Sequence, residues 1–214
     1  MIGYRALFAA LTVVAIIVQF IRSAEVPDFD PVNYFSYFTI LGNSFAAIVL
    51  AYGAYRLLSG NDTASHTYDR LRGANALYMA IIGVVFALLL SGTVTQMDST
   101  IRWVNTVVHY VMPVVVVADW FLVPTQTRLT FRDVLWWMAI PLLYLAYTLI
   151  RGPVVDWYPY PFVDAQTLGY GRVIRTCITI AIGTALAGYA IVALANELRS
   201  RQWSLGPLSR SASS

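Results

Sequence analysis

The stretch WVNTVVHYVMPVVVVADWFLV, residues 103–123, decides the fold class of this chain. It is apolar over about the 20 residues that a helix needs to cross a bilayer, so we predict a membrane-spanning helix here. His109 lies within this stretch and is one of two histidines in the chain. An ionisable side chain at membrane depth costs on the order of a few kcal/mol and marks a functional site by default. His109 is therefore the first candidate residue.

The composition extends this interpretation to the whole chain of 214 residues. Hydrophobic residues make up 58% of it and charged residues 12%, with a mean hydropathy of +0.64. A soluble domain carries about twice that charged fraction. We predict an all-α fold, a polytopic membrane helical bundle with no soluble domain and no nucleic-acid partner.

Six apolar segments are separated by polar breaks rich in turn-forming residues. They cover about residues 4–22, 33–58, 73–94, 101–123, 133–150 and 171–197. Each reaches or approaches the length of a membrane span. The fifth is the shortest, and we expect Pro141 to kink it. We predict a six-helix transmembrane domain over residues 1–198 and, from its polar composition, a disordered cytoplasmic tail over residues 199–214.

Arginine supplies all of the positive side-chain charge, because the chain contains no lysine. Nine arginines fall on the side of the N-terminus: Arg5, Arg56, Arg70, Arg72, Arg128, Arg132, Arg199, Arg201 and Arg210. Five fall on the other side: Arg22, Arg102, Arg151, Arg172 and Arg175. Positive residues favour the cytoplasmic side, so we predict that both termini are cytoplasmic. The use of arginine alone is typical of a GC-rich bacterial genome, and we expect a multi-pass protein of the bacterial inner membrane with a retained first helix.

Polar side chains accompany His109 at a similar predicted depth. With this topology, Thr39 and His109 both lie roughly 9–12 Å below the outer boundary of the membrane. Asn43 is one helical turn from Thr39 and Ser36 is three residues before it, while Asn105 is one turn before His109. A threonine hydroxyl beside a neutral imidazole would form a nucleophile and base pair, and amide side chains could orient the histidine or bind an oxyanion. Interhelical hydrogen bonding would explain Thr39 and Asn43 equally well.

Three stretches together resemble a known family. They are YFSYFTILGNSF (34–45), NTVVHYVMP (105–113) and DWYPYPFVD (156–164), the last preceded by YTLIRG (147–152). They are similar to the androgen-induced-protein family of multi-pass membrane hydrolases, which cleave fatty acid esters of hydroxy fatty acids, and most similar to its bacterial relatives. The resemblance implies that Thr39 is the nucleophile and His109 its partner, with a lipid or fatty acyl ester as substrate.

The loop after the fifth segment is aromatic. Trp157 and Tyr160 would form part of an aromatic belt at the membrane interface, or would cap the mouth of a pocket and contact substrate. Arg151 could pair with Asp156 or Asp164, or could hold a lipid carboxylate through two hydrogen bonds.

Other interpretations remain open from the sequence. His109 could be the relay of a proton-coupled small-molecule transporter with Asp119 as a second ionisable group, although no internal repeat is visible. We expect Asp119 to form a structural ion pair with Arg128 or Arg56. A haem site would need Met112 or a water as a second ligand beside the single membrane histidine. We predict no metal and no cofactor, and we expect the single Cys177 to serve packing.

Overall fold

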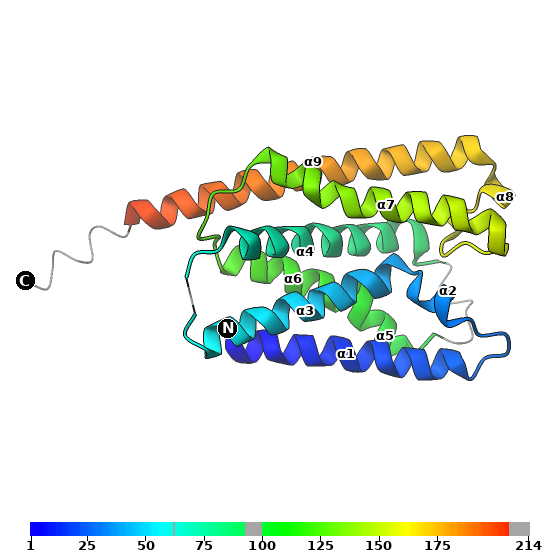
Figure 1. The fold of residues 1–214 in the computed structure, drawn as a ribbon, viewed down its shortest axis with the longest axis horizontal. Coiled ribbons are helices and arrows are strands. Elements are labelled where there is room, and N and C mark those ends of the chain that lie inside the picture. The colour runs from blue at the N-terminus through cyan, green and yellow to red at the C-terminus, as the bar shows by residue number, and fades with distance from the viewer. Residues whose placement is uncertain (62, 93–99, 206–214) are drawn as a thin grey trace, which may run out of the picture.

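The computed structural model describes residues 1–61, 63–92 and 100–205, with side chains up to residue 201. Within these ranges the protein is helical and contains no strand, which confirms the predicted all-α bundle (Figure 1). Among the described residues, six helical stretches are long and apolar enough to cross a membrane. They are α1 (Ile2–Ala24), α3 (Phe38–Leu58), α4 (His66–Val85) continued by the π-helical turn η1 (Phe86–Leu90), α5 (Arg102–Thr106) continued by the π-helical turn η3 (Val107–Val111) and α6 (Met112–Leu122), α7 (Phe131–Val155), and α9 (Tyr170–Leu205). Shorter helical segments are α2 (Pro31–Phe35), η4 (Pro161–Val163) and α8 (Ala165–Leu168).

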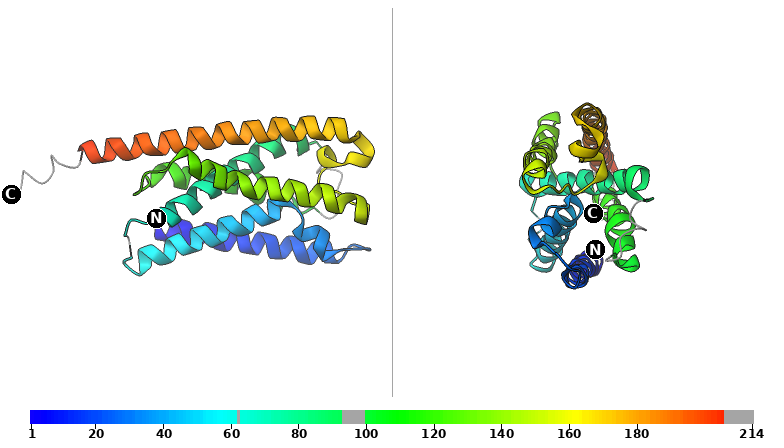
Figure 2. Two further views of the ribbon diagram at one scale, coloured as in Figure 1. Left: turned by 45° about the horizontal axis from the view of Figure 1, so that its top comes forward. Right: turned by 90° about the vertical axis from the view of Figure 1, so that its right-hand side faces the viewer.

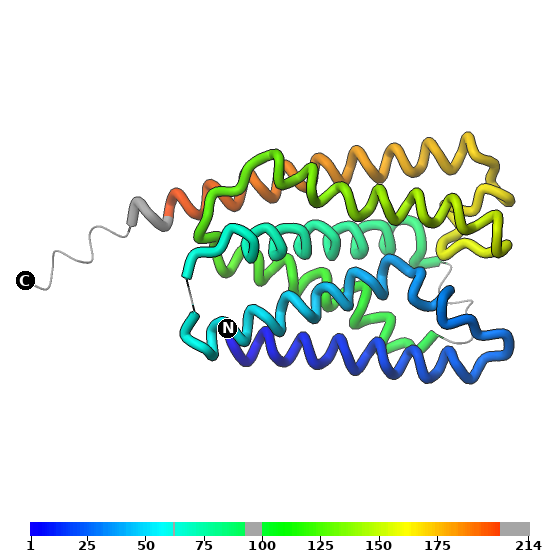
Figure 3. The backbone as a smooth tube through the Cα atoms, in the orientation of Figure 1, coloured from blue at the N-terminus to red at the C-terminus, as the bar shows by residue number. Residues whose placement is uncertain are grey.

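The long helices run up and down between two ends of the bundle (Figure 3). The N-terminus and the end of α9 lie at one end, which we call the terminal end. The opposite end carries α2 and α8, and we call it the distal end. Prediction placed the terminal end in the cytoplasm.

Helix α4 is the centre of the bundle. Viewed end-on, it lies between the pair α7 and α9 and the group formed by α1, α3 and α6 (Figure 2), and it contacts α3, α6, α7 and α9. About half of α3, α4 and the α5–α6 stretch is buried inside the protein, against about one fifth of α1, α7 and α9. The outer helices therefore present most of their apolar surface to lipid.

A small residue on α4 sets its distance from the helix that carries His109. A β-carbon placed on Gly83 would lie 3.0 Å from the β-carbon of Pro113 and 3.7 Å from the carbonyl oxygen of His109. Small residues allow helix backbones to approach closely in membranes. Gly83 thus lets η3 and α6 lie directly against α4.

A buried ion-pair cluster joins three helices near the terminal end. The carboxylate of Asp119 accepts from Arg5 Nε at 2.7 Å and from Arg72 Nη2 at 3.2 Å. The predicted partners, Arg128 and Arg56, were wrong: Arg56 donates instead to the carbonyl oxygens of the α3–α4 connection. Arg5 and Arg72 lie on α1 and α4, far from Asp119 in the sequence, and the packing of these helices against α6 brings them to its carboxylate.

Four predicted boundaries differ from those in the structure. The second span is divided by an extended residue, Tyr37, into α2 and α3. The third span begins at His66, seven residues before the expected residue 73. The fifth span is longer than expected and continues through Pro141. The boundary expected at residue 198 falls inside α9, which extends to Leu205, and residues 206–214 of the predicted tail lie outside the described residues.

Candidate active site

Thr39 lies at the start of a membrane-spanning helix. It is the second residue of α3, because the chain leaves α2 at Ser36 and passes through Tyr37 in an extended conformation. The prediction that Thr39 lies about six residues inside its helix was therefore wrong. The first backbone N–H groups of a helix have no acceptor within it, and that of Thr39 donates to the hydroxyl of Tyr160 at 3.1 Å. The nucleophile candidate thus occupies the partially positive end of α3.

His109 faces Thr39 from η3. Its Nε2 lies 3.3 Å from Thr39 Oγ1, so α3 and η3 meet at these residues, a contact that the sequence left open. Its Nδ1 lies 2.8 Å from Oδ1 of Asn105 and 3.3 Å from the carbonyl oxygen of the same residue. A backbone carbonyl only accepts, so the proton of the neutral ring belongs on Nδ1. Nε2 is then free to accept the hydroxyl proton of Thr39.

The histidine ring is held on one face by an aromatic ring. Phe86 is stacked on His109 with ring centroids 3.9 Å apart and an interplanar angle of 19°. Phe86 begins η1 and His109 lies in η3, so both rings belong to π-helical turns. Such turns are rare and often occur at functional sites, because the extra residue redirects the side chains that follow.

Asn43 connects the two helices of the pair without touching either reactive atom. Its Nδ2 donates to the carbonyl oxygens of Thr39 at 2.9 Å and of Val108 at 3.1 Å. The side chain is fully buried. We assign it a positioning role, consistent with the predicted orienting role.

Ser36 does not belong to this polar group. Its hydroxyl contacts the carbonyl oxygen of Val32 and the hydroxyl of Tyr147. The predicted polar stripe assumed one continuous helix, and the break at Tyr37 places Ser36 at the C-cap of α2 instead. Its role is to join α2 to α7.

Tyr160 brings the aromatic loop to Thr39. Its hydroxyl lies 3.3 Å from Thr39 Oγ1 as well as 3.1 Å from the backbone nitrogen. The loop therefore lies against Thr39, and its contact with a substrate stays a prediction. Burial raises the pKa of Tyr160, so the hydroxyl stays protonated and remains a hydrogen-bond donor.

Trp157 and Arg151 lie beside the site but do not line its cavities. Arg151 Nη2 donates to Oδ1 of Asn33 at 2.7 Å and lies 3.5 Å from a carboxylate oxygen of Asp30. The Trp157 ring lies 5.6 Å from the Arg151 guanidinium carbon. Of the two alternatives for Arg151, pairing with Asp156 or Asp164 was wrong, because α2, remote in sequence, folds against the end of α7. Binding of a lipid carboxylate stays a prediction. Arg151 holds α2 at the distal end.

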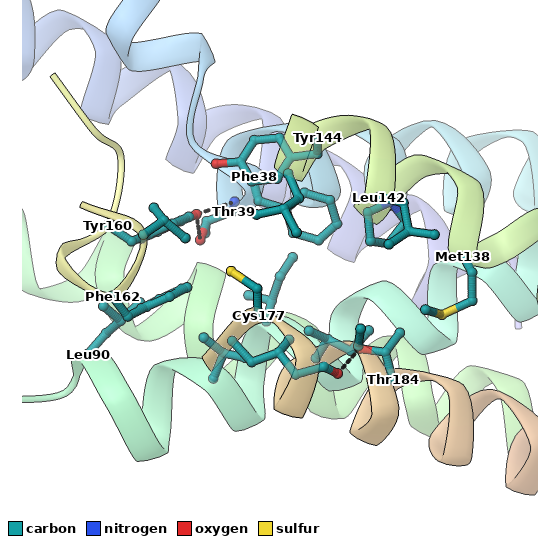
Figure 4. Close-up of a pocket in the computed structure, with 18 residues that line it drawn as sticks. Phe38, Thr39, Leu90, Met138, Leu142, Tyr144, Tyr160, Phe162, Cys177 and Thr184 are labelled. Carbon is teal, nitrogen blue, oxygen red and sulfur yellow. Dashed lines mark hydrogen bonds between the residues drawn. The ribbon is translucent and has the colours of Figure 1, made fainter. Parts of the chain in front are cut away.

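Two cavities meet at Thr39. The first has a volume of about 160 Å³ and is lined by α1, α2, η3 and the aromatic loop, including His109 and Asn105. The second has a volume of about 110 Å³ and lies between α3, α4, α7 and α9 (Figure 4). Thr39 and Tyr160 line both.

Sequence reasoning missed two residues of this arrangement. Phe86 looks like any apolar residue of a membrane span, and no local signal relates it to His109. Cys177 was assigned to packing, yet it lines the second cavity. Both roles depend on contacts between helices that are distant in sequence.

Comparison of the chain with protein-family models, curated proteins and solved structures finds no match in any of the three.

Proposed function

We propose that the chain is an integral-membrane lipid ester hydrolase with a threonine nucleophile. The observation that supports it is the chain of contacts from Thr39 Oγ1 to His109 Nε2, and from His109 Nδ1 to Asn105 Oδ1. A nucleophile, a base and a group that orients the base form the arrangement used for covalent hydrolysis. Asn105 serves as the orienting group.

In the proposed reaction, Thr39 Oγ attacks the ester carbonyl carbon while His109 Nε2 takes the hydroxyl proton. Negative charge then develops on the carbonyl oxygen. The Tyr160 hydroxyl lies 3.3 Å from Thr39 Oγ1 and 3.1 Å from the backbone nitrogen of Thr39. This hydroxyl and the Thr39 N–H would stabilise the charge. Water, activated by His109, releases the acyl group from Thr39.

The surroundings favour a lipid substrate. The second cavity has a mostly apolar lining and lies among helices whose outer surfaces face the bilayer. Together with the resemblance of the sequence, this favours fatty acid esters of hydroxy fatty acids or similar acyl esters. The membrane would be the bacterial inner membrane, as the arginine usage suggests.

Proton-coupled transport has less support. A relay through His109 would need further titratable groups along a path across the membrane. Asp119 is the acidic residue of the same span as His109, and two arginines bind its carboxylate. We therefore do not propose transport.

The test is labelling of the purified protein with a fluorophosphonate, together with hydrolysis of a fluorogenic fatty acyl ester. We expect Thr39→Ala and His109→Ala to lose both signals, and peptide mapping to find the label on Thr39. Thr179→Ala is the matched control, because Thr179 is an exposed threonine that bonds within its own helix. Full hydrolysis by folded Thr39→Ala would refute the covalent mechanism.

A further inference from the structure

The two cavities that meet at Thr39 differ in the groups they offer. His109 and Asn105 line only the first, together with Gln19 and Ser23 of α1. The second is apolar except for Cys177 and four hydroxyl-bearing residues, Thr39, Tyr144, Tyr160 and Thr184. The Thr184 hydroxyl donates to the carbonyl oxygen of its own helix at 2.7 Å, so it needs no partner from a ligand.

The shape of the second cavity places its hydroxyl groups at its ends. Thr39 and Tyr160 lie at one end and Met138 and Thr184 at the other, with Cys177 between them (Figure 4). Cys177 and Thr184 are seven residues apart on α9, which corresponds to about 10 Å along the helix. The cavity therefore extends from the candidate nucleophile toward the middle of the bilayer.

The bond changes of the proposed reaction indicate which part of the ester lies in each cavity. The bond from Thr39 Oγ to the acyl carbon forms, and the bond from that carbon to the alkoxy oxygen breaks. The hydroxyl proton passes through His109 Nε2 to the departing alkoxy oxygen. Water then attacks the acyl carbon and gives a proton to Nε2, which returns it to Thr39 Oγ as the acyl bond breaks. The alcohol leaves, and the water enters, on the side of His109.

From this we infer, on the basis of the proposed function, that the second cavity holds the acyl chain of the substrate and selects it by length. The first cavity holds the departing alcohol and then the hydrolytic water. Met138 and Thr184 form the floor against which the end of the acyl chain packs. Ala181, between Cys177 and Thr184 on α9, lines the wall of the cavity.

The test measures kcat/KM for p-nitrophenyl esters from acetate to palmitate. Ala181→Phe fills the acyl cavity, and we expect it to lower the ratio of long-chain to acetate hydrolysis by about tenfold or more, since each methylene group excluded from an apolar pocket changes selectivity by about that factor. Ile182→Phe is the matched control, because Ile182 is exposed on the outer surface of the same helix. We expect the control to keep the wild-type ratio.

A second measurement uses the wild-type protein and fills the cavity by chemical modification of one side chain. Cys177 is the single cysteine of the chain, so hexyl methanethiosulfonate modifies one site. We expect this modification to suppress long-chain hydrolysis more than acetate hydrolysis, and a reductant to restore it. Cys177→Ala protein should not respond to the reagent.

The outcomes separate this inference from the function on which it rests. If wild-type protein hydrolyses the esters but neither Ala181→Phe nor the Cys177 modification changes the chain-length profile, the acyl cavity is refuted and the hydrolase remains. If wild-type protein hydrolyses no ester, the proposed function fails and the acyl cavity with it.

Discussion

At the scale of single residues, the site depends on contacts among five side chains that limit one another's orientation. Asn105 places the proton of His109 on Nδ1, and the stacked Phe86 ring holds the imidazole plane. Nε2 then points to Thr39, whose hydroxyl also contacts Tyr160. Each contact removes an alternative orientation, and a preorganised site of this kind needs little rearrangement during reaction.

Tyr160→Phe tests the hydroxyl at this scale. The substitution keeps the aromatic ring over the site and removes only the donor beside Thr39. We expect kcat for ester hydrolysis to fall by about 10²–10³-fold, the usual effect of losing one oxyanion donor. Tyr158→Phe makes the same change in the same loop, away from Thr39, and should keep the wild-type kcat. A wild-type kcat in Tyr160→Phe would exclude Tyr160 from the reaction.

At the scale of elements, interruptions of regular helix place the reactive groups. The break at Tyr37 brings Thr39 to the first turn of α3, where its backbone N–H is available to another group. The π-helical turn η3 carries His109 between α5 and α6. Asn43 then ties the backbone of α3 to that of η3 through Val108.

Asn43→Ala tests this connection. The carbonyl oxygen of Val108 would lose its side-chain donor in a buried position, which we expect to lower the free energy of unfolding by about 1–3 kcal/mol. The measurement is the unfolding transition of purified protein in detergent. Ser44→Ala, on the neighbouring residue, should change stability by no more than about 0.5 kcal/mol. An Asn43→Ala protein as stable as the wild type would contradict the bridging role.

At the scale of the whole molecule, the candidate catalytic pair and the buried ion-pair cluster occupy different ends of the bundle. Thr39 and His109 lie toward the distal end. Asp119 joins α1, α4 and α6 toward the terminal end through Arg5 and Arg72. Asp119 follows His109 by ten residues, or about 15 Å along the helix. The cluster therefore stabilises the bundle without taking part in the proposed reaction.

Asp119→Ala should lower the free energy of unfolding by about 3–5 kcal/mol, because it leaves two buried guanidinium groups without their carboxylate. We expect the protein that remains folded to hydrolyse ester at a rate close to wild type. Glu197→Ala removes an exposed carboxylate paired with Arg201 and should cost no more than about 1 kcal/mol. Equal stability of the two variants, measured by unfolding in detergent, would show that the cluster does not hold the helices together.

Local properties of the sequence were enough to predict the fold class, the six spans and the two residues at the centre of the proposed site. Hydropathy is a local property, so residues 103–123 predict a span without knowledge of their neighbours. The cost of placing a histidine in a membrane likewise singled out His109. The polar residues at similar depth, together with the family resemblance, singled out Thr39.

The contacts between those residues could be seen only in the tertiary structure. Thr39 and His109 are 70 residues apart, and Asp119 and Arg5 are 114 apart. Their contacts follow from how α1, α3, α4 and the α5–α6 stretch pack, and helix periodicity carries no information about packing partners. The same packing places Ser36 against α7, away from the site, and brings Arg5 and Arg72 to Asp119. It stacks Phe86 on His109 and places Cys177 in the wall of the second cavity. It also placed Thr39 between two cavities, on which the proposed division of the substrate rests.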